Sequence, residues 1–205
     1  MKHDGGRRIL LAALVVCLGL LVFLFARRSV DAQMQIERRH PRVNGDLYMT
    51  VDGDSVATIH GAGKLYDADV RAMLNSVGLH EDTVEDIIVG DRVTEICYNT
   101  FDGYDRLKSL KLGDRVARVA PGSLKNCPAL EYLWFPEKLE DVGLDFLYMC
   151  KTCIIVTGGK ASGLPELANV RTQKRILAGV DSHEALMVAI GDEALPAGVA
   201  KWWRQ

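Results

Sequence analysis

The sequence predicts a mixed, mainly β fold: a short solenoid of 23-residue units with a helical C-terminal cap, preceded by a single transmembrane helix. Three observations support this prediction. Residues 87–155 repeat with a fixed period, residues 9–25 are apolar without a break, and helix-capping signals return after residue 159. A fixed period in this size range is the mark of a repeat architecture, in which each unit packs only on its neighbours.

The repeat consists of three consecutive segments whose apolar positions align: IIVGDRVTEICYNTFDGYDRLKS (87–109), LKLGDRVARVAPGSLKNCPALEY (110–132) and LWFPEKLEDVGLDFLYMCKTCII (133–155). The spacing Leu-x-x-Leu-x-Leu at Leu107, Leu110 and Leu112 is typical of a leucine-rich solenoid. Five columns of the alignment hold Val93, Val116 and Leu139; Ile96, Val119 and Val142; Phe101, Leu124 and Leu147; Leu107, Leu130 and Cys153; Leu110, Leu133 and Val156.

These patterns divide the chain into a basic tail (1–8), a transmembrane signal-anchor (9–26), a polar linker (27–45), a hairpin and helix cap (46–86), the repeats (87–158) and a helical C-terminal cap (159–205). Residues 1–42 hold eight basic and three acidic residues, whereas the remainder holds 17 basic and 24 acidic residues, a net charge of −7. An acidic main domain argues against nucleic-acid binding, which needs a basic face.

The apolar run Ile9–Phe25, extended by Ala26, would span roughly 27 Å as a helix, near the lower limit for crossing a bilayer. Arginine pairs bracket it on both sides, as expected at the headgroup layers. We therefore expect a retained single-pass anchor with an extracytoplasmic soluble domain. A cleaved signal peptide, with a small-residue site at Val30-Asp31-Ala32, is the alternative. The downstream arginines alone would favour a cytoplasmic domain, but long domains translocate regardless of that count.

Two short alternating runs, Leu47–Val51 and Val56–Ile59, predict a β-hairpin with Gly53 at positive φ in its turn. A helix over Asp67–Val77, capped by Asp67 and ended by the following glycine, is predicted next. Together they would cover the first repeat, which otherwise exposes an apolar end.

The repeat also carries a more specific motif. Val93-Thr94-Glu95-Ile96 opens one unit, and Phe101-Asp102-Gly103-Tyr104 continues it. Pro136 and Val142-Gly143 stand at the matching places of the following units. In these residues the chain resembles the BspA-like leucine-rich repeat family over residues 47–158, with Tyr104 in place of that family's first cysteine. The resemblance implies a solenoid fold and a cell-surface binding or adhesion role without a shared catalytic site.

Cys150 and Cys153 form a C-x-x-C pair, which in other proteins carries redox or metal chemistry. In the repeat register they occupy the Cys and Leu columns, so both are expected to be buried. A zinc site would need two more ligands, and the histidines show no ligand spacing, so no metal or cofactor is expected. A disulfide between Cys127 and Cys150 remains open if the domain lies outside the cell.

Residues that flank the buried leucines are expected to point out of the sheet and to form a binding surface. The candidates are Lys108, Lys111, Tyr132, Trp134 and Ile155, with Ile154 as the alternative outward residue of the last unit. In the alternative interpretation, the C-terminal segment or a loop covers Trp134.

The C-terminal part is predicted to contain, in order, a helix at Leu164–Ala168, a strand at Arg175–Ala178, a helix capped by Asp181 with Glu184 reaching back, and a Trp202-Trp203 pair that closes the solenoid end. The adjacent Asp181-Ser182-His183 cannot form a catalytic triad, because consecutive side chains do not converge. The sequence thus predicts a membrane-anchored, non-catalytic module that binds a protein or surface ligand. The alternative is a scaffold subunit of a membrane complex.

Overall fold

The computed structural model describes residues 46–203 apart from 144, 151, 160–172 and 192–194. The predicted anchor, the linker and the predicted helix at Leu164–Ala168 lie outside the described residues. Across the part of the chain that is described, no helix has both the length and the apolar character needed to cross a bilayer.

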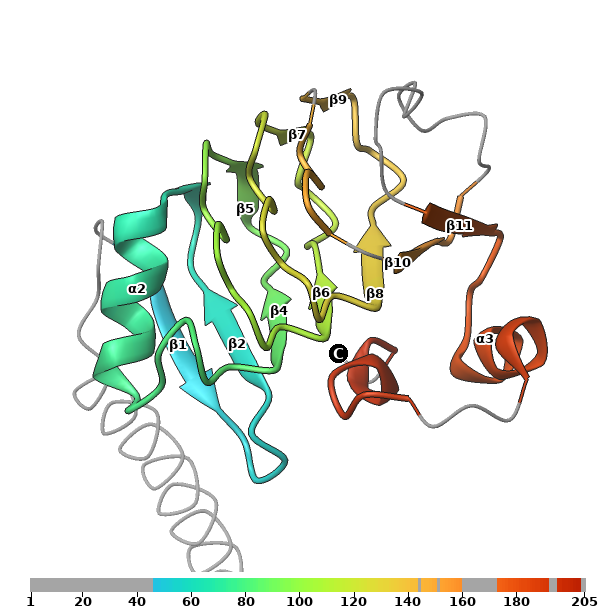
Figure 1. Cartoon of the computed structure of the whole chain (residues 1–205), viewed down its shortest axis with the longest axis horizontal. Coiled ribbons are helices and arrows are strands. Elements are labelled where there is room, and N and C mark those ends of the chain that lie inside the picture. Colours follow the sequence, from blue (N-terminus) through green and yellow to red (C-terminus); the bar gives the residue numbers. More distant parts are fainter. Residues whose placement is uncertain (1–45, 144, 151, 160–172, 192–194, 204–205) are drawn as a thin grey trace, which may run out of the picture. The chain divides into compact units, whose positions relative to one another are not determined.

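The repeats form a β-solenoid in which successive turns contribute one strand to a large sheet and one to a small sheet (Figure 1). All neighbouring strands are parallel except β1 and β2, which are antiparallel. The large sheet is ordered β1 (Tyr48–Val51), β2 (Ala57–His60), β4 (Asp86–Val89), β6 (Ser109–Lys111), β8 (Tyr132–Phe135), β10 (Thr152–Thr157) and β11 (Gln173–Ala178). The small sheet is ordered β3 (Gly63–Leu65), β5 (Val93–Ile96), β7 (Arg118–Val119) and β9 (Asp141–Val142).

The main core lies between the two sheets and contains most residues of the predicted columns. In the small sheet, Ile96 pairs with Val119 and Val119 with Val142, as the 23-residue register predicts. In the large sheet, Leu110 pairs with Leu133, and both side chains are fully buried. The repeat alignment is therefore confirmed for the first two units and for the whole small sheet.

The predicted alignment was wrong by one residue at the last member of the Leu110 column. Leu133 pairs with Ile155 and not with Val156, which instead pairs with Trp134. Strand β10 begins earlier in its unit than β6 and β8 do in theirs, so plain alternation places Cys153 and Ile155 on the inward face. A shift of one residue exchanges the two faces of a strand, and Ile155 is therefore a core residue.

The predicted hairpin is present, but its turn differs from the prediction. Ser55, with φ of 62°, takes the left-handed conformation that was expected at Gly53. The Asp52 carboxylate accepts hydrogen bonds from the N–H groups of Asp54 and Val56, which stabilises the five-residue loop between β1 and β2.

Helix α2 (Asp67–Ser76) follows β3 and lies at the N-terminal end of the solenoid, as predicted (Figure 1). The predicted cap was wrong, because Tyr66 is the N-cap and no side chain bonds there. Asp67 instead pairs with Arg71 one turn later, at 2.8 Å. Gly78 ends the helix with φ of 78°, as its place after the last apolar residue predicted.

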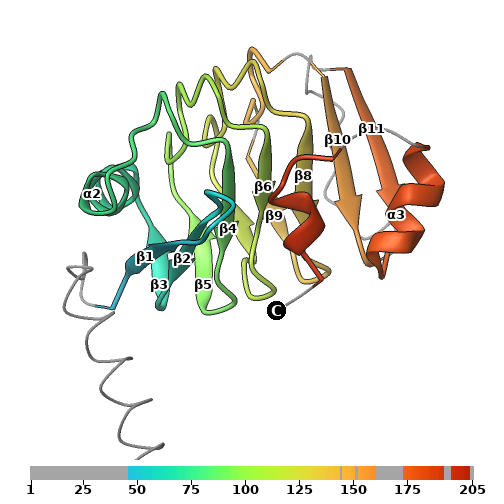
Figure 2. The same cartoon turned by 90° about the horizontal axis from the view of Figure 1, so that it is seen from below.

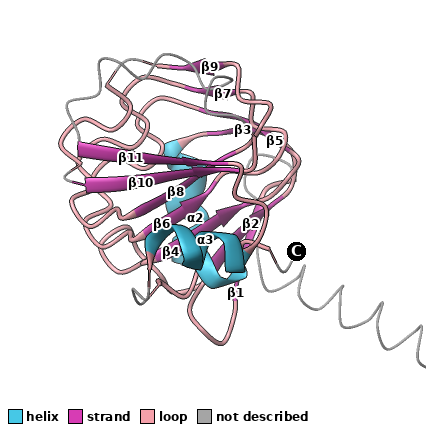
Figure 3. Ribbon diagram, turned by 90° about the vertical axis from the view of Figure 1, so that its right-hand side faces the viewer, coloured by secondary structure: helices cyan, strands magenta, loops and turns pink. Residues whose placement is uncertain are grey.

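The C-terminal elements do not close the solenoid end as predicted. Helix α3 (His183–Ile190) and the 3₁₀ turn η2 (Val199–Lys201) lie on the outer side of the large sheet (Figures 2 and 3). The N-cap of α3 is Ser182, whose hydroxyl accepts the Ala185 N–H at 3.2 Å, and not Asp181. These elements form a second apolar cluster with the outer face of the sheet, because that face is itself largely apolar and needs cover.

Candidate binding site

Two rows of side chains cross the outer face of the large sheet. Paired positions on neighbouring parallel strands place Asp86, Ser109, Tyr132 and Ile154 in one row, and Ile88, Lys111, Trp134 and Val156 in the other. All of them are buried except Trp134 and Ile154, which are half-buried. The surface that the sequence predicted to be open is therefore covered.

The cover is the C-terminal segment, Leu195–Trp203. The ammonium group of Lys111, a residue only 8% exposed, donates a hydrogen bond to the Trp202 carbonyl oxygen at 2.8 Å. The carboxylate of Asp86 accepts hydrogen bonds from the Ser109 hydroxyl and from the N–H of Gly198. A Cβ at Gly198 would lie 2.5 Å from Ser109 Oγ and 2.7 Å from Asp86 Cβ, so this close approach requires glycine.

Charges hold the segment at two further points. Lys201 forms ion pairs with Asp52 and, at 2.7 Å, with Asp54 in the hairpin turn. Burial alone would raise the pKa of Asp52, but hydrogen bonds from Lys201 and from backbone N–H groups outweigh it and lower that pKa.

Burial raises the pKa of Asp86, although the Ser109 hydroxyl and the Gly198 N–H favour its ionised form.

Three tryptophans meet where the C-terminal segment lies on β8. The ring of Trp134 is nearly perpendicular to that of Trp203 (87°, centroids 5.5 Å apart) and lies 5.8 Å from that of Trp202. Edge-to-face pairs at such distances are favourable for aromatic rings. The indole N–H groups of Trp134 and Trp202 are buried without a hydrogen-bond partner among the described residues.

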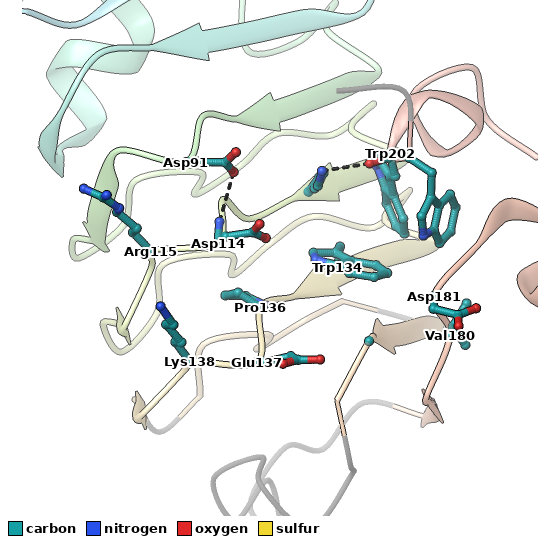
Figure 4. Close-up of a pocket in the computed structure, with 13 residues that line it drawn as sticks. Asp91, Asp114, Arg115, Trp134, Pro136, Glu137, Lys138, Val180, Asp181 and Trp202 are labelled. Atoms are coloured by element: carbon teal, nitrogen blue, oxygen red, sulfur yellow. Dashed lines mark hydrogen bonds between the residues drawn. The ribbon is translucent and has the colours of Figure 1, made fainter.

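A pocket of about 710 Å³ opens beside this cluster (Figure 4). We call it the tryptophan pocket. Its volume falls in the range of about 300–1,000 Å³ that small-molecule sites occupy. Trp134 and Trp202 lie on one side, and charged side chains from the turns of three successive units lie on the other (Figure 4). The lining consists of Asp91, Lys111, Asp114, Arg115, Trp134, Pro136, Glu137, Lys138, Gly158, Val180, Asp181, Trp202 and Trp203.

The structure brings together two of the five predicted site residues. Lys111 and Trp134 line the tryptophan pocket. Lys108 lines a separate cavity of about 450 Å³ and pairs with Glu85 at 2.6 Å. Tyr132 is buried in the second apolar cluster. The prediction that Ile155 points outward was wrong, because the register of β10 places it in the main core.

The sequence-based prediction missed the charged rim of the pocket. Asp91, Asp114 and Arg115 come from the turn that repeats as Gly90-Asp91-Arg92 and Gly113-Asp114-Arg115, so the repeat alignment itself indicated part of the rim. The N–H of Asp114 donates to the Asp91 carboxylate at 3.1 Å, which links the two turns. Parallel stacking of identical turns thus sets like side chains side by side at the mouth of the pocket.

The cysteines of the repeats are buried, as predicted, and have a more specific role than filling space. The thiols of Cys127 and Cys150 each donate a hydrogen bond, at 3.0 Å, to a carbonyl of the preceding unit, on Phe101 and Leu124. Cys97, Cys127, Cys150 and Cys153 are free thiols in this structure. Within the described ranges, no three potential ligand side chains are close enough to hold a metal ion.

No protein-family model matches the chain, and no curated protein matches it. Among solved structures, the chain is similar to a leucine-rich repeat protein from Eubacterium ventriosum, known from a crystal structure. The two share 13% sequence identity and superpose with a TM-score of 0.42, over 68% of this chain and 44% of that one. The chain thus spans less than half the length of that neighbour.

Proposed function

We propose that the chain is a membrane-anchored, non-catalytic binding module of the BspA-like leucine-rich repeat kind, displayed outside the cytoplasm, whose ligand binds in the tryptophan pocket. The observation that carries this proposal is the pocket itself. It combines half-buried aromatic walls with a charged rim, the composition that recognition sites share. Its walls come from two rigid strands and the C-terminal segment, so the site is largely formed before a ligand arrives.

A photo-reactive residue on the rim tests the pocket as the ligand site. Lys138 is exposed and lines the pocket, whereas Arg106 is exposed and pairs with Glu85 elsewhere. Two variants carry the photo-reactive residue, one at position 138 and one at position 106, and each is produced in cells as the full chain. After irradiation, we expect the variant at position 138 to form a covalent adduct with its ligand, seen as an increase in mass, and the variant at position 106 to form none. Trp203→Ala should remove the adduct. Equal adducts from both positions, or none from position 138, would refute the pocket as the site.

The membrane anchor is tested by an alkaline carbonate wash of membranes. The full chain should stay in the pellet, because residues 9–26 form an apolar segment long enough to span a bilayer. Val16→Arg places a charge at the centre of that segment and should release the chain into the wash. A mature N-terminus at Gln33 would instead establish the cleaved signal peptide.

The side of the membrane is tested by adding protease to intact cells. Loss of the domain is the expected result, with a cytoplasmic protein as the control for cell integrity. Survival of the domain on intact cells, and its loss after lysis, would place it inside and remove the adhesion role.

A further inference from the structure

We propose that the tryptophan pocket takes a neutral saccharide. This inference rests on the proposed function and names the ligand class of the same site. Two features of the pocket select this class: charged side chains of both signs that have no ion-pair partner among the described residues, and an aromatic wall.

Ion pairs bridge neighbouring turns at several places on the solenoid, as between Lys64 and Glu95 at 2.8 Å and between Arg118 and Asp141 at 3.1 Å. None of the charged residues that line the pocket forms an ion pair with another described residue. The acids are Asp91, Asp114, Glu137 and Asp181, and the bases are Lys111, Arg115 and Lys138.

This mixture of charges selects against ionic ligands. An anion would meet the four carboxylates, and a cation would meet the three bases, among them the largely buried Lys111. A hydroxyl group both donates and accepts hydrogen bonds, so it can donate to a carboxylate and accept from an ammonium or guanidinium group. A neutral ligand rich in hydroxyls can therefore bond to both kinds of rim residue.

The aromatic wall suits the other part of such a ligand. A sugar ring presents C–H groups on its faces and hydroxyls at its edge, so a face can pack on indole while the edge reaches the rim. The half-buried rings of Trp134 and Trp203 supply that wall. A Cβ at Gly158 would lie 3.5 Å from Glu137 Oε1 and 3.7 Å from the Trp134 ring, so a carboxylate acceptor and the indole edge both border this glycine.

Saccharide binding is measured by isothermal titration and by tryptophan fluorescence, on the full chain in a detergent without a sugar headgroup. The probes are a glycan array and, in solution, maltotriose, cellotriose and triacetylchitotriose, with sialyllactose and a chitosan trimer as charged counterparts. We expect a neutral probe to bind and to shift the fluorescence. Its affinity should hold between low and high salt, since a neutral ligand is not screened.

Three variants locate the binding. Trp203→Ala should weaken it by about tenfold or more, as loss of an aromatic anchor does. Gly158→Leu should block it without removing a lining side chain, because its side chain would extend between Glu137 and Trp134. Tyr98→Ala, at an exposed aromatic residue that does not line the pocket, should leave it unchanged. Circular dichroism melting confirms that each variant is folded.

The inference is overturned if no neutral glycan binds, if a charged probe binds more tightly, or if Tyr98→Ala weakens binding as much as Trp203→Ala. Position 138 could form an adduct that depends on Trp203 while no saccharide binds. This outcome would overturn the saccharide as the ligand class and would leave the proposed function standing. Saccharide binding that Gly158→Leu and Trp203→Ala do not affect would overturn the pocket as the site in both proposals.

Discussion

Gly198 shows how one missing side chain positions the C-terminal segment. Its φ of −61° is accessible to any residue, so only space requires glycine there. Gly198→Ala would push the segment away from Asp86 and Ser109 and should lower the free energy of unfolding by about 1–3 kcal/mol, the usual cost of overpacking. Denaturant titration followed by tryptophan fluorescence measures it. Gly53→Ala is the control, because a Cβ there meets nothing within 4 Å, and equal losses from both changes would contradict the close-approach account.

The thiols of Cys127 and Cys150 act as hydrogen-bond donors between turns. The neighbouring Cys150 thiol raises the pKa of Cys127, and burial raises it further, so the reactive thiolate is scarce at neutral pH. We expect a thiol reagent to label Cys127 only after unfolding. Cys127→Ala should cost about 1–3 kcal/mol, because it leaves the buried Phe101 carbonyl without this donor. A mass that rises by two hydrogens on reduction would instead reveal a Cys127–Cys150 disulfide.

At the scale of elements, the register of β10 can be tested with two adjacent residues. Ile155 is fully buried in the main core, whereas Ile154 is half-buried on the outer face. Ile155→Ala should cost about 2–5 kcal/mol, as core truncations do. Ile154→Ala should cost less than about 1.5 kcal/mol, because the side chain is half-buried and loses less apolar contact on truncation. Urea unfolding of the two variants measures the difference. A larger loss of stability from Ile154→Ala than from Ile155→Ala would contradict this register and favour the one predicted from the sequence.

The ion pairs between Lys201 of η2 and the hairpin turn predict that the stability of the domain depends on pH. The pKa of Asp52 is lowered from 3.8, so its stabilising effect is complete above the unfolded-state pKa and is lost as pH falls through the folded-state value. The pKa of Lys201 is raised from 10.5 by hydrogen bonds to Asp52 and Asp54, so its effect is lost only at strongly basic pH. Lys201→Gln should therefore lower the free energy of unfolding at pH 7. Below about pH 4, the free energies of unfolding of the variant and of the parent chain should become more similar.

The same comparison needs a control for charge alone. Lys138→Gln removes a positive charge that forms no ion pair with a described residue, so its effect on stability should be small at both pH values. A difference between Lys201→Gln and the parent chain that stays constant from pH 7 to pH 3 would contradict the ion pair as the cause. Unfolding of each variant is followed by tryptophan fluorescence, since η2 leads directly into Trp202.

At the scale of the whole molecule, the solenoid and its cover should be separable. The main core lies between the two sheets, and the second cluster lies on the outside of the large one. A chain that ends at Gly191 should keep the far-ultraviolet dichroism of the solenoid and melt at a lower temperature, because repeat stability is mainly a sum of neighbouring interfaces. Binding of a hydrophobic dye should rise as Trp134 and Ile88 become exposed. Complete unfolding of this chain would show that the cover is part of the core.

Much of the fold could be predicted from the sequence, because the same spacing of buried apolar residues recurs in each repeat. The columns through Ile96 and Leu110 needed only the 23-residue period. The outward placement of Ile155 failed because the early start of β10 depends on pairing with β11, which the period does not encode. The pocket could not be predicted as a unit, since Trp202 and Lys111 meet only through the path of the C-terminal segment.

The tie between Lys201 and Asp52 joins residues 149 positions apart. A solenoid can fold one turn at a time as it leaves the ribosome, since each turn needs only its neighbour. This tie is a contact of high sequence separation, and such contacts form late because they close a long loop. The C-terminal wall of the tryptophan pocket is therefore completed late in folding, after Leu195–Trp203 has reached the large sheet. Loss of this segment would leave most of the β-structure in place and would remove two of the three tryptophans that line the pocket.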